Sequence, residues 1–166
     1  MRGLSLLLSS CGMAAALLIW RMLLPLVPQD PVASMGVRLG LALAALLPVA
    51  AVLAAMILAQ MIGRFVSGAL DPLIGRETPF LVTNQRIITN TVEQMAVFVP
   101  SLLACAAGAS ASRLPAVLAL AGTFASARIV FWGGYLSAPI ARAPGMAATA
   151  LVNLAALVAA TWFWLS

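Results

Sequence analysis

The chain has 166 residues, of which 64% are hydrophobic and only 8% are charged, and its mean hydropathy is +1.11. Soluble domains are about 45–50% apolar, so this composition excludes a soluble globular protein and indicates an integral membrane protein built as one compact domain. The net charge of +5 comes from scattered arginines, which favours membrane orientation over nucleic-acid binding. Because histidine is absent, metal sites and nucleophile–histidine pairs lose their usual partner, and we expect no metal site.

Five apolar segments follow one another along the chain, each long enough to cross a bilayer as an α-helix. We expect the first to be retained as a helix and not removed as a signal peptide, because only Arg2 precedes it and Arg21 interrupts it. Pro48 should kink the second segment. The segments lie at about residues 4–27, 36–62, 87–109, 114–136 and 146–165.

The connections between the segments predict an antiparallel bundle. The polar stretch 64–86 is the one long loop that we expect, whereas only residues 110–113 separate the third and fourth segments, which should form a tight hairpin. The predicted fold is therefore an all-α integral membrane protein. Residues 36–166 would form an antiparallel four-helix transmembrane bundle, and residues 1–35 would hold an extra N-terminal transmembrane helix.

The arginines between the segments predict the orientation in the membrane. If the amino terminus is cytoplasmic, the far side holds only Arg38 and Arg113. The five-to-two bias favours this topology, because cytoplasmic loops carry an excess of basic residues. The cytoplasmic side then collects Arg2, Arg64, Arg76, Arg86 and Arg142.

The third segment begins with a polar stripe. At 100° per residue, Arg86, Asn90 and Glu93 fall within about 60° of one another on a helix, so they share one face. A carboxylate at bilayer depth costs about 2.5–3.5 kcal/mol on insertion scales, which marks Glu93 as a candidate functional residue.

The fourth segment carries a second polar face. Arg128 and Tyr135 are separated by seven residues, about 20° from eclipsed, and Phe131 lies between them. Across the tight hairpin, Glu93 and Arg128 differ in depth by only about 6 Å, so we expect them to form an ion pair. Two interpretations of this pair stay open, because it would either fix the packing of the helices or belong to a functional site.

These polar residues follow one another in an order that resembles the MAPEG family, membrane-associated proteins in eicosanoid and glutathione metabolism. The resemblance covers about residues 36–166 and is to a bacterial-type member, which implies an inner-membrane protein whose site faces the cytoplasm. It rests on an Arg-x-x-x-Asn-x-x-Glu motif and on an Arg, Tyr, Arg series at intervals of seven: Arg86, Asn90 and Glu93, then Arg128, Tyr135 and Arg142.

The resemblance implies four-helix protomers, assembly into a homotrimer, and glutathione held between neighbouring protomers near the cytosolic face. By position, the residues of the Asn90 motif would hold the backbone of glutathione, and Tyr135 would donate a hydrogen bond to it. Arg142 would lie near the sulfur as a catalytic residue. Arg64 resembles the arginine of the family's first helix and is the second expected catalytic residue.

The chemistry of glutathione agrees with these residue types. Its two carboxylates call for guanidinium groups such as that of Arg128, while Glu93 would bind either its ammonium group or Arg128. We therefore expect a membrane-bound transferase or peroxidase that uses glutathione as co-substrate and takes a lipophilic electrophile from the bilayer. Two alternatives stay open: a small proton-coupled exporter that uses Glu93, and a non-catalytic membrane scaffold.

Overall fold

The computed structural model describes residues 2–27, 34–71 and 77–165, and throughout these ranges the regular structure is helical. Five helical spans are long and apolar enough to cross a membrane, as the sequence predicts, so the chain is an integral membrane protein. The elements are α1 (Arg2–Leu23), η1 (Leu24–Leu26), α2 (Met35–Ala45), α3 (Leu47–Ser67), α4 (Pro79–Gly108), α5 (Leu114–Ser137) and α6 (Ala143–Leu165).

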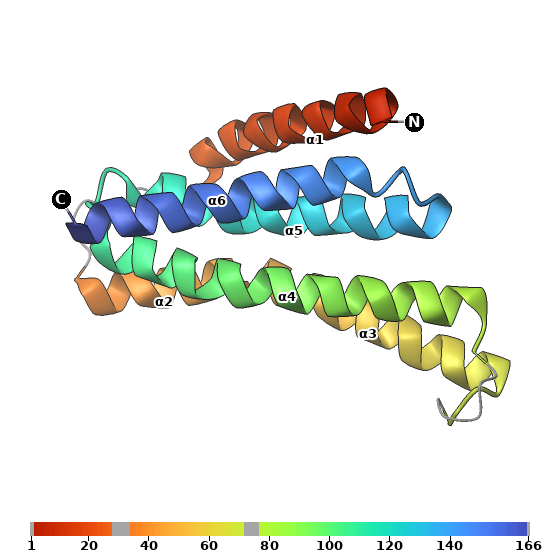
Figure 1. Ribbon diagram of the computed structural model, residues 1–166. Helices are drawn as coiled ribbons and strands as arrows, with labels where there is room; N and C mark the ends of the chain where they lie inside the picture. The colour runs from red at the N-terminus through yellow and green to blue at the C-terminus, as the bar shows by residue number, and fades with distance from the viewer. Residues whose placement is uncertain (1, 28–33, 72–76, 166) are drawn as a thin grey trace.

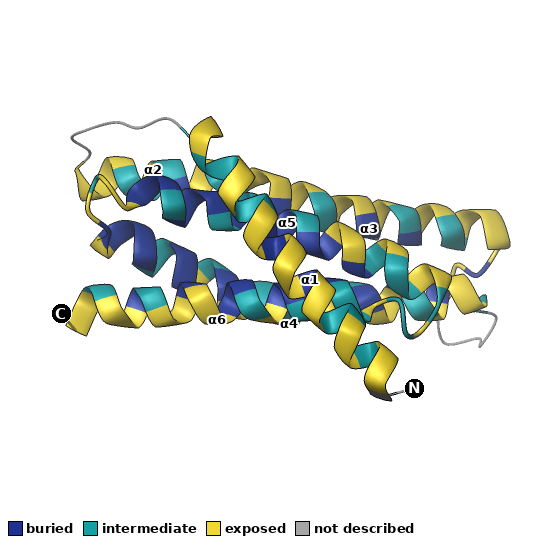
Figure 2. Cartoon of the chain, turned by 90° about the horizontal axis from the view of Figure 1, so that it is seen from above, coloured by how far each residue is buried: buried dark blue, intermediate teal, exposed yellow. Residues whose placement is uncertain are grey.

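Helices α2 to α6 form one bundle, and α1 lies outside it (Figure 1). The pair α2–α3 packs on α4 and α5, while α6 packs on α4 and α5 from the other side. Seen from above, α1 crosses the bundle obliquely and is exposed over most of its surface (Figure 2). It contacts α5 and α6. The division of the chain at residue 35 stays a prediction, since residues 28–33 lie outside the described part.

Helix α5 is the central element of the bundle. Its span is 67% buried, against 11% for the span that contains α1. Phe124 of α5 stacks on Phe98 of α4, with ring centroids 4.2 Å apart, in the middle of the apolar core. Because five other α-helices contact α5, its polar side chains must find partners within the bundle or in a cavity.

The predicted kink and the predicted hairpin are both confirmed. Helix α2 ends at Ala45 and α3 begins at Leu47, so that Pro48 lies in the first turn of α3, where its missing N–H costs no hydrogen bond. Helices α4 and α5 are joined by residues 109–113 and run antiparallel (Figure 1).

The prediction of a long loop over residues 64–86 is wrong. Helix α3 continues to Ser67, and α4 begins at Pro79, two turns before the predicted start. The side chain of Thr78 caps α4 by accepting a hydrogen bond from the amide of Leu81, and proline suits the first helical position. The polar composition of this stretch predicts a loop, but the cap formed by Thr78 and the proline that follows it start α4 earlier. Arg76 lies outside the described residues.

Candidate functional site

The first half of α4 carries the predicted stripe. Arg86 is exposed and Asn90 is half-buried one turn further along the same face. Thr91, next to Asn90, is buried and faces α5, where it accepts a hydrogen bond from Arg128. The helix thus offers one side to α5 and the adjoining side to the exterior of the protomer.

Arg128 reaches from α5 towards this stripe and is only 1% exposed. Its Nη2 donates to Oδ1 of Asn90 at 3.2 Å and to Oγ1 of Thr91 at 2.7 Å. Its guanidinium carbon lies 4.0 Å from the centre of the Phe131 ring, a cation–π arrangement. Phe131 in turn meets the edge of Tyr135, with ring centroids 5.7 Å apart. One side of α5 therefore joins an arginine to two aromatic rings.

The connection between α5 and α6 returns to this side of α5. Gly134 permits the return, because a Cβ there would overlap the carbonyl oxygen of Ala141. The close approach brings Arg142 over the ring of Tyr135, with 4.8 Å from the guanidinium carbon to the ring centre. Arg142 itself is exposed, so its guanidinium remains accessible from outside the protomer.

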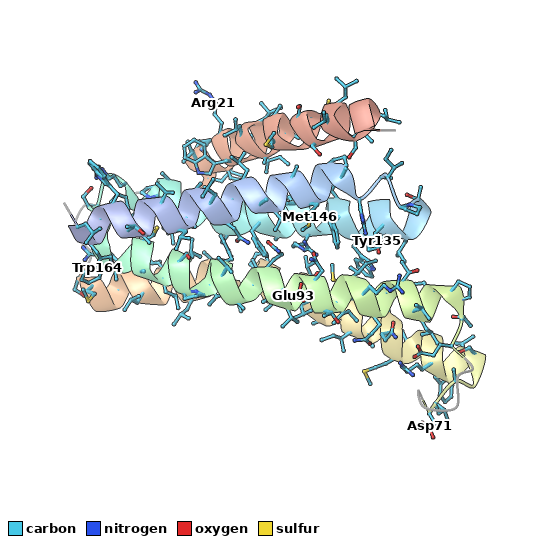
Figure 3. All side chains as sticks on the ribbon, viewed as in Figure 1. Arg21, Asp71, Glu93, Tyr135, Met146 and Trp164 are labelled. Atoms are coloured by element: carbon cyan, nitrogen blue, oxygen red, sulfur yellow. The ribbon has the colours of Figure 1, made fainter. Side chains whose placement is uncertain are left out.

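These side chains enclose a pocket of about 290 Å³ between α4, α5 and the start of α6. In Figure 3, Tyr135 and Met146 lie toward the end of the bundle that carries the connection between α3 and α4, whereas Trp164 lies at the other end. We call this cavity the arginine pocket. It is lined by Arg86, Asn90, Phe131, Tyr135, Arg142 and Met146. Four of the seven predicted site residues thus line one cavity, and Arg128 joins it through Asn90.

The predicted ion pair between Glu93 and Arg128 is wrong for the protomer. Glu93 is exposed and forms no ion pair with Arg128, whose hydrogen bonds go to Asn90 and Thr91. Arg128 binds on the Thr91 side of α4, and Glu93 lies about 160° around the helix from Thr91. Similar depth in the membrane therefore does not bring the two charges together.

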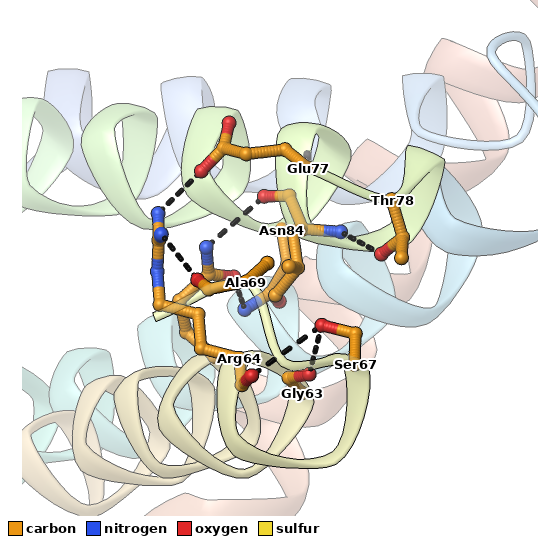
Figure 4. A network of polar contacts seen from close by, with 9 residues as sticks. Gly63, Arg64, Ser67, Ala69, Glu77, Thr78 and Asn84 are labelled. Atoms are coloured by element: carbon orange, nitrogen blue, oxygen red, sulfur yellow. Dashed lines mark hydrogen bonds and ion pairs between the residues drawn. The ribbon is translucent and has the colours of Figure 1, made fainter. Parts of the chain in front are cut away.

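Arg64 lies apart from the arginine pocket in the protomer. It occupies the last turn of α3, where its guanidinium pairs with Glu77 at 2.5 Å and donates to the carbonyl of Ala69 at 3.4 Å (Figure 4). Arg64, the second expected catalytic residue, therefore does not line the arginine pocket of its own chain.

Sequence reasoning missed a buried amide network beside the pocket. Asn84 is fully buried, and its Nδ2 donates to the carbonyl of Met56 at 3.0 Å and to Oε1 of Gln60 at 2.9 Å. Its Oδ1 accepts from the indole N–H of Trp132 at 2.8 Å. Gln60, a single glutamine in an apolar span, is the sequence feature that indicates such a network, because a buried amide requires hydrogen-bond partners. The network ties α3, α4 and α5 together directly behind the arginine pocket.

The fold and the pocket define a helical membrane protein with a cluster of guanidinium groups at one end of its bundle. The sequence profile of the MAPEG family matches residues 36–162, which includes every residue that lines the pocket. The chain therefore belongs to the MAPEG family. Searches of curated proteins and of solved structures found no match.

Proposed function

We propose that the protein is a membrane-bound, glutathione-dependent transferase or peroxidase that acts on lipophilic electrophiles. Members of the MAPEG family generally use glutathione in such reactions, which supports the proposal. The observation that carries it is the arginine pocket, which two guanidinium groups line and a third joins through Asn90, without a carboxylate. Arg86, Arg128 and Arg142 have no acidic partner among the described residues.

Arg128 has the strongest requirement for an anion. Its Nε and Nη1 are buried and have no hydrogen-bond partner, and both of its acceptors, on Asn90 and Thr91, are neutral. Leaving a buried charge unpaired costs about 3–5 kcal/mol in mutational studies. A ligand carboxylate at the pocket would supply the missing negative charge, and glutathione carries two carboxylates.

Arg142 is the residue that we assign to the sulfur. A free thiol has a pKa of about 8.5 and is mostly protonated at neutral pH. A guanidinium group that lowers this pKa by about two units contributes about 2.7 kcal/mol in favour of the thiolate. The proton leaves to water at the open side of the pocket. The thiolate then attacks the electrophilic carbon, the carbon–sulfur bond forms, and the leaving group departs with its electron pair.

The exposed position of Glu93 supports the proposal that the protein assembles as a homotrimer. Its carboxylate is exposed on α4 in the middle part of a span, where contact with lipid would cost about 2.5–3.5 kcal/mol. A neighbouring protomer would cover this face, and the ammonium group of glutathione bound at the boundary would pair with Glu93. Arg64 would reach the sulfur only across such a boundary, since it lies outside the pocket of its own chain.

We further propose that the arginine pocket faces the cytoplasm of a bacterial cell, in the inner membrane. Arg64, Arg86 and Arg142 belong to the end of the bundle where α3 ends and α4 and α6 begin. Arg38, Arg113 and also Arg21, which Figure 3 labels near the end of α1, belong to the opposite end. The predicted five-to-two bias thus becomes five to three when Arg21 is counted, and its direction is retained.

Binding of glutathione to the full-length protein in mild detergent tests the proposal. Glutathione should raise the melting temperature, and its analogue ophthalmic acid, which keeps both carboxylates and the ammonium but lacks the thiol, should raise it as well. Ophthalmic acid should then inhibit conjugation of glutathione to chlorodinitrobenzene. The absence of any shift with either peptide would contradict the proposal and leave a membrane scaffold.

A further inference from the structure

Helix α1 covers an elongated apolar cavity on α5 and α6. A cavity of about 340 Å³ lies between the three helices, and a second of about 230 Å³ continues it along α1, with Ala16 and Thr123 lining both. We call the two together the α1 groove. Its only charged lining residue is Arg113, and the hydroxyl of Thr123 already donates to the carbonyl of Ala119 at 2.9 Å. Apart from that arginine, the groove therefore offers only apolar surface to a ligand.

Two close contacts hold α1 over this cavity. Near its carboxyl end, the indole N–H of Trp20 donates to the carbonyl of Ala116 at 2.9 Å. Near its middle, Gly12 lies so close to Pro144 that a Cβ would overlap the carbonyl oxygen of that proline. The helix is thus fixed to α5 at one point and to the start of α6 at another. The α1 groove lies between these two contacts, which fix the position of α1 over it.

Arg113 gives one end of the groove a positive charge. It precedes α5, is exposed, and has its guanidinium carbon 5.4 Å from the centre of the Phe163 ring of α6. No carboxylate pairs with it among the described residues. A cation at the end of an apolar groove matches an amphiphile with an anionic head and an apolar chain.

The Arg113 end of the α1 groove lies far from the arginine pocket, and the groove and the pocket share no lining residue. Arg113 and Tyr135 lie 22 residues apart along α5, which is about 33 Å at 1.5 Å per residue. That distance is about the hydrocarbon thickness of a bilayer, so the two charged ends face opposite membrane surfaces. An anionic head bound at Arg113 could therefore not reach a thiol at Tyr135.

We propose that the α1 groove binds an acyl chain of an anionic phospholipid from the leaflet opposite the arginine pocket, with its headgroup phosphate at Arg113. The bilayer surrounds the groove with such chains, and an unfilled apolar cavity loses the dispersion contacts of its lining. The chain would act as a bound structural lipid that fixes α1 to the family domain, which begins only at residue 36. This inference does not depend on the reaction proposed above.

Native mass spectrometry of the full-length protein in mild detergent tests the proposal. Phosphatidylglycerol and phosphatidylcholine with identical chains are added at equal concentration. We expect phosphatidylglycerol to be retained about fivefold better, since one basic residue near an anionic headgroup contributes about 1 kcal/mol. Arg113→Gln should abolish the preference, and Arg113→Lys should retain it. Arg21→Gln is the matched control, because it removes one arginine at the same end of the bundle without altering the groove lining.

A second pair of variants tests the apolar part of the groove. Ala155 lines the cavity but is itself exposed, so Ala155→Phe should fill the space and reduce retention of phosphatidylglycerol at least fivefold. Ala150→Phe, on an exposed position of the same helix outside the groove, should leave retention unchanged. Equal retention of the two lipids, no retention of either, or an equal loss in Arg21→Gln and Arg113→Gln would overturn the proposal.

Discussion

The arginine pocket and the Arg113 end of the α1 groove lie at opposite ends of the protein, and both contain arginine without a carboxylate partner among the described residues. Their surroundings differ. The pocket adds an amide and a phenol to its guanidinium groups, whereas the groove surrounds one arginine with aliphatic side chains. The same unpaired charge therefore implies a small hydrophilic polyanion at one end and an amphiphile at the other.

Helix α5 connects the two regions and explains why they can differ so sharply. One side of α5, from Ala116 to Val130, lines the α1 groove, and Phe131 and Tyr135 line the arginine pocket. Helix α5 is the most buried of the five spans, and its Arg128 and Trp132 are oriented by hydrogen bonds to side chains of α4. The groove, in contrast, has α1 as one wall, which is the most exposed span. Ligand binding at the arginine pocket should therefore depend on individual polar contacts. Binding at the α1 groove should depend on how well the ligand fills the apolar cavity.

The largest expected effect is that of Arg142→Leu on turnover. Loss of a group that stabilises developing or resident negative charge typically lowers kcat by about 10²–10³. Turnover of chlorodinitrobenzene should fall by that factor, while the affinity for glutathione falls much less, because Arg86 and Arg128 still bind the carboxylates. Steady-state kinetics and calorimetry measure the two effects separately. Equal losses in turnover and affinity would assign Arg142 to binding alone.

Tyr135→Phe is the companion of that variant. The ring of Tyr135 lies against Arg142 and Phe131, and phenylalanine preserves both contacts. If the hydroxyl only donates a hydrogen bond to the ligand, turnover should fall by less than about tenfold, in keeping with the loss of one neutral hydrogen bond of about 0.5–1.5 kcal/mol. A loss as large as that of Arg142→Leu would make Tyr135 the partner of the thiol.

Arg86→Gln should have the next largest effect, on affinity. A hydrogen bond to a charged group contributes about 1.5–3 kcal/mol, so the Kd for glutathione should rise by about 10- to 150-fold. Arg21→Gln is the matched control, since it removes the same charge at the opposite end of the protein and should leave the Kd unchanged. Calorimetric titration distinguishes a local contact from a general effect of net charge, which would weaken both variants alike.

Asn84→Leu tests the buried network behind the pocket and should act on stability. The change leaves the indole N–H of Trp132 and the Oε1 of Gln60 without a partner, at about 1–3 kcal/mol for each unsatisfied group. The melting temperature of the detergent-solubilised protein should fall, whereas Gln85→Leu, on the neighbouring exposed position, should change it little. Equal melting temperatures for the two variants would show that the network contributes nothing to the rigidity of the pocket.

The features that the sequence predicted are those with a local physical cause. Hydropathy over about 20 residues identifies a span, Pro48 interrupts the second segment and begins a new helix, and seven-residue spacing places Arg128 and Tyr135 on one face. The predicted ion pair between Glu93 and Arg128 is wrong because similar depth along two helices does not fix which faces of the helices meet, and this depends on the rotation of each helix about its axis. That rotation is set by packing between helices.

The network of Asn84 and the α1 groove could not be predicted for the same reason. Gln60, Asn84 and Trp132 come from three helices, and no spacing within one helix indicates that they meet. The groove depends on where α1 crosses α5 and α6, which is decided by close contacts such as that of Gly12 with Pro144. Residues that act through a single helix face are readable from sequence, whereas those that act across helices require the structure.

The ionisation of bound glutathione tests the central claim most directly. Thiolate absorbance near 240 nm is recorded while the pH of the full-length protein with saturating glutathione is varied. If Arg142 lowers the pKa of the bound thiol by about two units from about 8.5, the thiolate band persists at pH 7 and is lost as the pH falls through about 6.5. The band should be absent at pH 7 in Arg142→Leu. A bound thiol that titrates near 8.5 in the unmodified protein would contradict the account.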